Sequence, residues 1–162
     1  MGKVVERDRL VAELAPYRAA GRKIVFTNGF FDLMHAGHVR YLREAASLGD
    51  ILLVGLNSDA SIRQSQKPGR PILPEGDRAE VLAALEMVDY VVLFGERTAE
   101  ALVAEVRPDV YVKGGDYSPE NLPEARIAEG YGGRVVLVRY HEERSTTGII
   151  QKILDSYCPK RT

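Results

Sequence analysis

Residues 23–38 read KIVFTNGFFDLMHAGH, and this stretch decides the fold. It opens with an apolar run over residues 23–27, which is typical of a buried strand. A loop over residues 28–36 follows, and apolar residues then recur at helical spacing until Gly49, where the predicted helix ends. The order of strand, loop and helix predicts the first unit of a parallel α/β sheet.

The rest of the chain repeats this alternation, without internal repeats or a long linker. Further strands are predicted at residues 51–56, 90–94, 110–113 and 134–139. Helices are predicted at residues 8–20, 77–85, 98–106 (with Thr98 as N-cap), 122–130 and 147–154. We therefore expect an α/β fold with a single Rossmann-like domain over residues 1–162. In it, residues 1–22 form a helical lead-in and residues 23–155 a five-stranded parallel sheet flanked by helices.

The composition is that of an ordinary globular protein, since 45% of the 162 residues are hydrophobic and 28% are charged. With 22 Lys and Arg against 23 Asp and Glu, the net charge of -1 gives no reason to expect nucleic acid or a membrane as partner. One cysteine, Cys158, indicates a reducing compartment. No apolar run approaches the ~20 residues that span a bilayer, and residues 1–6 lack the apolar region of a signal peptide. We therefore expect a cytoplasmic protein.

Two of the three histidines, His35 and His38, lie three residues apart around Gly37 at the predicted helix start. Residues at this spacing share a helix face, and a helix N-terminus attracts anions through its unpaired N–H groups and its dipole. Gly37 would let phosphate oxygens approach the backbone. The pattern favours a phosphate site. Two alternatives stay open: histidines that only pack or cap, and a metal site formed by His35, His38 and Asp32.

More polar residues follow the later strands, where ligands of open α/β sheets bind. Lys113 ends the predicted fourth strand and is interpreted as a phosphate ligand, with a solvated strand end as the alternative. Ser145, Thr146 and Thr147 open the last helix, so they could bind phosphates, cap the helix or do both. The residues expected at this edge also include Asn57, Asp59, Gly114, Gly115 and Asp116.

A Pro-containing loop over residues 66–74 is a candidate mobile lid, because it carries cations that could reach bound phosphates. Those cations are Lys67 and Arg70, with Arg78 just beyond the loop. For Asp59, capping of a short helix is an equally open interpretation.

Several motifs occur in a fixed order: FTNGFFDLMHAGH, VGLNSD, KPGRPI, VKGGDY and RSTTGII. The HxGH motif after a first strand resembles the nucleotidyltransferase superfamily. The whole set, over roughly residues 10–154, resembles the D-glycero-β-D-manno-heptose 1-phosphate adenylyltransferases. This resemblance implies a Rossmann-like fold of the HxGH type and transfer of AMP from ATP to a sugar 1-phosphate, with release of pyrophosphate. It implies Mg²⁺ that arrives with the nucleotide rather than a resident metal, a role in ADP-heptose and lipopolysaccharide synthesis, and a homo-oligomer. The family's kinase domain is missing, so we expect a separate sugar kinase.

The resemblance also implies residue roles. His35, His38 and Lys113 would be catalytic, stabilising charge on the α-phosphate and the leaving group. Asp32 would hydrogen-bond within the phosphate loop or lie beside Mg²⁺ or the acceptor, although an Asx-turn is an equal alternative. Nucleotide contacts are implied for Thr27, Asn28, Gly29, Phe30, Phe31, Gly37, Arg78, Gly114, Gly115, Ser145, Thr146 and Thr147, and acceptor contacts for Asp32, Asn57, Asp59, Lys67, Arg70 and Asp116.

Other functions fit the sequence less well. A redox Rossmann enzyme is disfavoured because no GxGxxG follows the first strand, and a P-loop NTPase because no GxxxxGK[ST] occurs. Glycerol-3-phosphate cytidylyltransferases carry an Arg-Thr pair where this chain has Tyr140 and His141, which weakens that alternative. A non-catalytic nucleotide sensor remains the alternative from another class.

Overall fold

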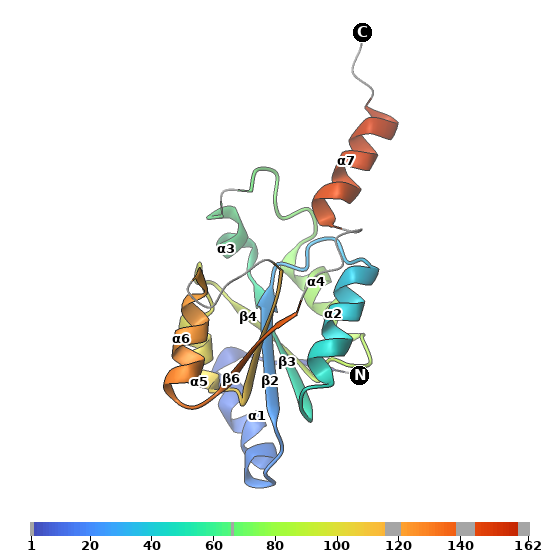
Figure 1. The fold of residues 1–162 in the computed structure, drawn as a ribbon. Helices are drawn as coiled ribbons and strands as arrows, with labels where there is room; N and C mark the ends of the chain where they lie inside the picture. The colour runs from blue at the N-terminus through green and yellow to red at the C-terminus, as the bar shows by residue number, and fades with distance from the viewer. Residues whose placement is uncertain (1, 66, 116–120, 139–144, 159–162) are drawn as a thin grey trace.

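The computed structural model describes residues 2–65, 67–115, 121–138 and 145–158. In these ranges six strands form one parallel sheet in the order β1-β4-β3-β2-β5-β6 (Figure 1). The strands are β1 (Lys3–Val4), β2 (Ile24–Gly29), β3 (Ile51–Asn57), β4 (Tyr90–Phe94), β5 (Val110–Gly114) and β6 (Arg134–Val138). The helices are α1 (Arg7–Ala19), α2 (Ala36–Ala46), α3 (Asp59–Arg63), α4 (Glu75–Ala83), α5 (Glu100–Val106), α6 (Pro123–Gly130) and α7 (Thr146–Tyr157).

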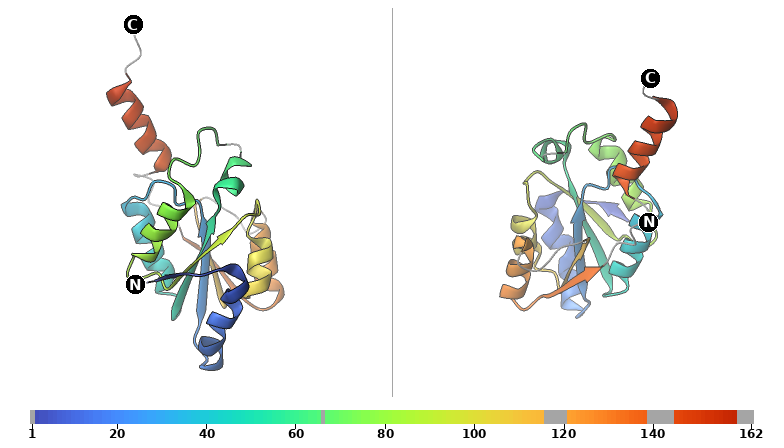
Figure 2. Two further views of the ribbon diagram at one scale, coloured as in Figure 1. Left: turned by 180° about the vertical axis from the view of Figure 1, so that it is seen from behind. Right: turned by 45° about the horizontal axis from the view of Figure 1, so that its top comes forward.

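Helices cover both faces of the sheet (Figures 1 and 2), and the alternation of side chains along the strands divides the core between the two faces. In β2, Ile24 and Phe26 pack with α1, α5 and α6, whereas Val25 packs with α2 and α4. Both faces are covered, so the central strands are apolar almost throughout rather than alternating with polar residues. This explains why the buried strands were recognisable as apolar runs.

The predicted five-stranded sheet is wrong by one strand, because β1 lies within residues 1–22, which were expected to be only a helical lead-in. Lys3 and Val4 are both exposed, so no apolar pattern marks them. Backbone bonds pair the strand with β4: the Lys3 N–H donates to Asp89 O and the Val5 N–H to Val91 O, both at 2.9 Å. An edge strand held by its backbone leaves no signature in the side chains.

The other predicted elements are confirmed with small shifts at their ends. Strand β2 runs on through Asn28 and Gly29, which pair with Gly55 and Leu56 of β3, so the loop expected over residues 28–36 begins only after Gly29. The N-cap of α5 is Ala99 rather than Thr98, and that of α3 is Ser58 rather than Asp59.

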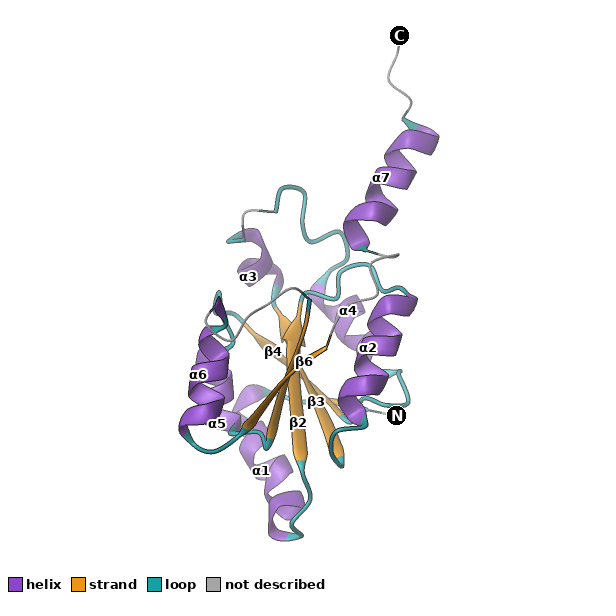
Figure 3. Cartoon of the chain, in the orientation of Figure 1, coloured by secondary structure: helices purple, strands orange, loops and turns teal. Residues whose placement is uncertain are grey.

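The connections place a ligand site at the carboxyl edge between β2 and β5. From β2 the chain proceeds through β3 to β4 on one side, and β5 and β6 then add on the other side of β2. Ligands of open parallel sheets bind at such a reversal of strand order. Helix α7 starts at this edge and projects away from the body of the domain (Figure 3). Among the described helices none is long and apolar enough to span a membrane.

Candidate active site

A cavity of about 570 Å³ opens at this carboxyl edge. Many of the predicted site residues line it together, although they come from separate segments of the chain: Asn28, Gly29, Phe30, Phe31, Asp32, His38, Asn57, Lys67, Arg70, Lys113, Gly114, Ser145, Thr146 and Thr147. Other predicted residues lie outside its lining: Thr27, His35, Gly37, Asp59, Arg78 and Gly115. Asp116 falls outside the described residues.

The two motif histidines meet at the start of α2. His35 is the N-cap, and its Nδ1 accepts a hydrogen bond from the Gly37 N–H at 3.1 Å. The rings of His35 and His38 stack with their centroids 3.9 Å apart, and the Phe31 ring approaches His38 edge-on at 5.4 Å. Phe31 has a φ of 44°, a left-handed conformation that bulky residues rarely adopt. The loop therefore accepts backbone strain where its ring contacts His38.

The contacts of this pair bear on the position of the proton in a neutral His35 and on the charge of His38. Because His35 Nδ1 accepts a bond, the neutral ring carries its proton on Nε2 and can donate there. Burial, and next the charge of His35, lower the pKa of His38 from 6.5 to about 4. At neutral pH the His38 ring is thus uncharged before an anion binds, and it still offers one N–H donor.

Lys113 reaches the cavity from the end of β5. Its Nζ donates to Asn28 O at 3.3 Å and to Asn28 Oδ1 at 3.2 Å, and the Tyr111 hydroxyl donates to the same Oδ1 at 2.9 Å. Burial lowers the pKa of the Lys113 ammonium, Glu124 acts to raise it, and Lys67 adds to the lowering. The Lys113 side chain is therefore half-buried and oriented by Asn28, and it is not a solvated strand end.

Asp32 holds the loop that was expected to be a lid. Its carboxylate accepts from the N–H groups of Ile72 and Leu73 at 2.8 and 2.9 Å and from Arg70 Nη1 at 2.7 Å. Burial acts to raise the pKa of Asp32, but the Leu73 N–H, Arg70 and the Ile72 N–H together hold it below its ordinary value. The predicted Asx-turn within its own loop is therefore not what Asp32 forms; it binds a segment about forty residues further along.

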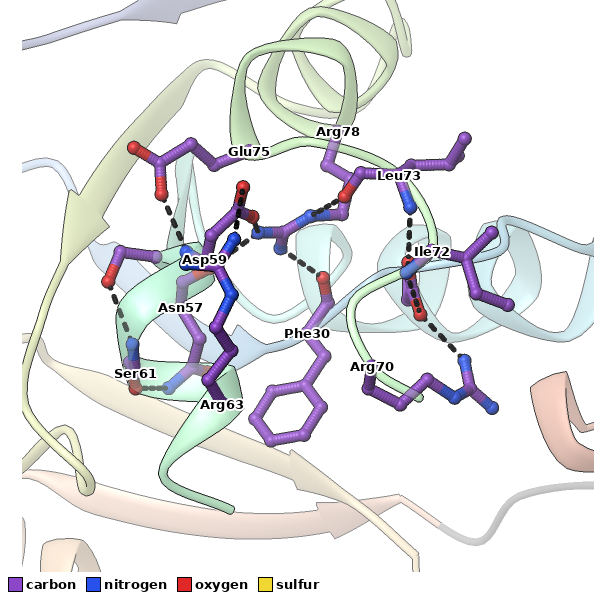
Figure 4. A network of polar contacts seen from close by, with 12 residues as sticks. Phe30, Asn57, Asp59, Ser61, Arg63, Arg70, Ile72, Leu73, Glu75 and Arg78 are labelled. Atoms are coloured by element: carbon purple, nitrogen blue, oxygen red, sulfur yellow. Dashed lines mark hydrogen bonds and ion pairs between the residues drawn. The ribbon is translucent and has the colours of Figure 1, made fainter. Parts of the chain in front are cut away.

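Arg78 joins several segments beneath the cavity (Figure 4). Its guanidinium donates to the carbonyl oxygens of Phe30, Asn57 and Leu73 at 2.6, 3.0 and 3.0 Å, and to Asp59 Oδ1 at 2.7 Å. The residue is 1% exposed. Arg78 thus lies inside the protein and joins the loops after β2 and β3 to the start of α4. It does not line the cavity, as its predicted contact with phosphate would require.

The other predicted residues support the edge in different ways. Asn57 Nδ2 donates to Ser61 Oγ at 2.9 Å, and the buried Thr27 hydroxyl bonds to Tyr41. Gly115 has a φ of 118°, a backbone conformation that residues with a side chain rarely adopt. Ser145 caps α7 by accepting from the Gly148 N–H at 3.0 Å. Capping at the last helix is confirmed, and Ser145 lines the cavity as well.

The metal alternative gains no support from this geometry. Both carboxylate oxygens of Asp32 accept hydrogen bonds from the 70–73 segment. In the described ranges no three His, Cys, Asp or Glu side chains gather in a way that could hold a metal ion.

Part of the cavity lining was not predicted from the sequence: Arg97 and Thr98, which follow β4, and Asn121 and Glu124, which lie near the start of α6. Arg97 and Thr98 had a usable signal, because they follow a predicted strand and so belong to the ligand-binding edge. Glu124 had none, since one acidic residue near the start of a predicted helix is a common stabilising feature.

A parallel sheet with a cation-lined cavity at its reversal point, beside the N-terminus of a histidine-bearing helix, defines a Rossmann-like α/β domain of the HxGH type. The chain belongs to the cytidylyltransferase-like family, whose model matches residues 26–152.

Named proteins and a solved structure are similar to this chain. Proteins named bifunctional protein HldE from Geobacter metallireducens and Syntrophotalea carbinolica are 51% and 52% identical over 155 residues, which cover 96% of this chain and 32% of each relative. The chain thus spans about a third of the length of the curated relatives it matches. A crystal structure of the lipopolysaccharide core biosynthesis protein from Thermoplasma volcanium GSS1 is 32% identical with a TM-score of 0.62, covering 76% of this chain and 100% of that one.

We predict that Arg78→Lys lowers the free energy of unfolding by on the order of 3 kcal/mol, because one ammonium cannot reach acceptors on separate segments and leaves buried groups unpaired. Urea unfolding monitored by circular dichroism measures this. Arg63→Lys is the matched control: Arg63 lies 3.9 Å from the same Asp59 carboxylate, but its side chain is 67% exposed. Equal losses in the two variants would contradict the assignment.

We predict that the His38 imidazole titrates with a pKa of about 4 in the ligand-free protein. Between pH 6.5 and about 4 the unfolded chain then holds a proton at this position that the folded chain lacks. Acidification through that window therefore lowers the free energy of unfolding, and above it the full stability is present. Imidazole NMR resonances, assigned by their loss in His38→Gln, report the midpoint. A midpoint near 6.5 contradicts the prediction.

Proposed function

We propose that this chain is a nucleotidyltransferase that moves AMP from ATP to D-glycero-β-D-manno-heptose 1-phosphate, producing ADP-heptose and pyrophosphate. The observation that carries the proposal is the convergence of His38, Lys113 and the Ser145–Thr147 segment on one cavity. Membership of the cytidylyltransferase-like family and the ordered motifs of the heptose 1-phosphate enzymes support it. So does the likeness to a protein whose title assigns it to lipopolysaccharide core biosynthesis.

In the proposed reaction an oxygen of the acceptor phosphate attacks the α-phosphorus of ATP. The new P–O bond forms as the bond from the α-phosphorus to the bridging oxygen breaks, and pyrophosphate carries away the negative charge. The acceptor phosphate is ionised near neutral pH, since the second pKa of a phosphate monoester is about 6, so no general base is needed. Catalysis then consists of positioning and of stabilising charge.

The residues at this edge divide these tasks. The proposed donors for the α-phosphate and the leaving pyrophosphate are Nε2 of His38, which lines the cavity, and Nε2 of His35, whose ring stacks on His38 but lies outside the lining. Lys113 is proposed to supply positive charge on the lining. Hydroxyls and N–H groups at the start of α7 are suited to the terminal phosphates. Lys67 lies over the Phe30 ring at 5.3 Å and Arg70 pairs with Asp32, so both cations are positioned by protein contacts at the cavity wall.

Mg²⁺ is proposed to enter with ATP and to leave with pyrophosphate, neutralising phosphate charge. The acceptor is supplied by a sugar kinase, and the similarity to longer proteins named bifunctional is compatible with a fused or a separate kinase. We also propose a homo-oligomer of the domain in the cytoplasm. The exposed Ile153, Leu154 and Tyr157 of α7 favour such an association.

We predict that His38→Ala and His35→Ala each lower kcat by roughly 10²- to 10³-fold, the loss expected when one charge-stabilising donor is removed. Pyrophosphate release measures turnover, and circular dichroism checks the fold. Arg40→Ala is the control, because Arg40 is an exposed cation on the same helix. Wild-type turnover in either histidine variant would remove that histidine from the mechanism.

The substrate assignment predicts that ATP with heptose 1-phosphate gives a higher kcat/KM than CTP with glycerol 3-phosphate. A site that hydrogen-bonds sugar hydroxyls rejects an acceptor lacking them by up to ~10⁴-fold, because its buried polar groups lose their partners. All four pairings of nucleotide and acceptor are measured by pyrophosphate release. A preference for CTP with glycerol 3-phosphate overturns the substrate and keeps the chemistry, whereas nucleotide binding without turnover on any acceptor indicates a sensor.

A further inference from the structure

Glu124 is a buried acid in a cavity otherwise suited to anions. It lies in the first turn of α6, is 4% exposed and lines the same cavity as Lys113. Its Oε1 accepts from the Ala99 N–H at 3.0 Å, at the N-terminus of α5, where no cap side chain is present. The carboxylate is thus fixed between two helices.

Capping alone does not account for an acid here. A glutamine would also accept from the Ala99 N–H through its amide oxygen, because that bond needs only an acceptor. A carboxylate adds negative charge that repels phosphate at short range in a poorly solvated site. A buried carboxylate is stabilised by a nearby cation, and cations of the protein line the same cavity.

Lys113 is the cation that this charge favours. Both side chains line one cavity and α6 packs on β5, so the two charges lie on the same lining. The Glu124 charge acts to raise the pKa of the Lys113 ammonium, which burial lowers. The other charged groups on the lining of the described residues are Asp32, Lys67, Arg70 and Arg97, with His38 as the titratable imidazole. Asp32 is paired with Arg70 at 2.7 Å, which leaves Glu124 as the acid on the lining that no arginine or lysine contacts directly within the described residues.

We propose that Glu124 is a positioning residue whose carboxylate is the counter-charge that keeps the Lys113 ammonium in the cavity, ready to meet a phosphate. The identity of that phosphate, as part of ATP, rests on the proposed function. The Glu124 carboxylate also repels a bound phosphate. This repulsion is outweighed by the attraction between the phosphate and Lys113, which would be lost if Lys113 were uncharged.

The test separates the charge of Glu124 from its cap. Glu124→Gln keeps an acceptor for the Ala99 N–H and removes the charge, whereas Glu124→Asp keeps the charge. Glu129→Gln removes the same charge from an exposed position on the same helix. In ligand-free full-length protein labelled with ¹³C at lysine Cε, the Lys113 signal is assigned by its loss in Lys113→Arg and followed by NMR against pH.

We expect the Lys113 titration midpoint to move to lower pH in Glu124→Gln, and to stay near the wild-type value in Glu124→Asp and Glu129→Gln. An unchanged midpoint in Glu124→Gln, or equal shifts in Glu124→Gln and Glu129→Gln, overturns the proposal. If Glu124→Gln does not fold, a midpoint in Glu124→Asp as low as expected for Glu124→Gln overturns it, and a preserved one supports it.

The pH profile of kcat/KM gives an independent readout. We expect its alkaline limb to move to lower pH in Glu124→Gln and not in Glu129→Gln, a change that a merely structural role would not produce. If the wild-type chain turns over no nucleotide, the proposed function fails, while the NMR titration still decides the role of Glu124.

Discussion

The guanidinium of Arg78 is the contact on which the ligand edge depends. Parallel strands end at this edge in separate loops, and loops alone have no regular hydrogen bonding to hold them in register. Arg78 bonds to carbonyl oxygens after β2, at the end of β3 and before α4, and its charge is balanced by Asp59. A planar group with five N–H donors can meet so many acceptors at once, whereas lysine cannot. Asp32 makes the reciprocal connection, from the β2 loop to the 70–73 segment.

This framework explains how a chain with balanced charge can present a cationic cavity. The acids that could neutralise the cavity are committed to holding backbone and arginine: Asp32 to the 70–73 segment and Asp59 to Arg78. The cations Lys67, Arg70, Arg97 and Lys113 line the cavity, and Asp32, which pairs with Arg70, and Glu124 are the acids on that lining among the described residues. The local field differs from the net charge because of how the acids are placed, and not because basic residues are in excess.

Much of the fold was predictable from the sequence because buried parallel strands are apolar on both faces. The strands β2 to β6 and the helix after β2 follow from apolar runs and helical spacing. Strand β1 could not be found, since its pairing is made by backbone N–H groups of exposed residues. The cap of α5 was misplaced for a related reason: the acceptor for the Ala99 N–H comes from Glu124, 25 positions away, and a local pattern cannot show it.

The candidate site likewise contains residues that a local sequence pattern could predict and residues that it could not. His38, Lys113 and the start of α7 were predictable because each follows a strand or opens a helix, which places it at the ligand edge whatever the tertiary details. The role of Arg78 was not predictable, because an arginine that binds phosphate and an arginine that joins loops inside the protein look the same in the sequence. Only the packing of the folded chain distinguishes them. Asp32 and Glu124 show the same limit, since the partner of each is distant in sequence.

The stacked histidines couple the protonation of His38 to the binding of phosphate. Burial, and next the repulsion between two imidazolium rings stacked 3.9 Å apart, favour a neutral His38 in the ligand-free pair. In the proposed reaction a phosphate beside His38 would favour the protonated ring, and by linkage a proton on His38 would strengthen phosphate binding by the same factor. The neutral state avoids a buried, uncompensated charge when the cavity is empty. The full electrostatic contact then develops only when the phosphate is present, which is when charge stabilisation is required.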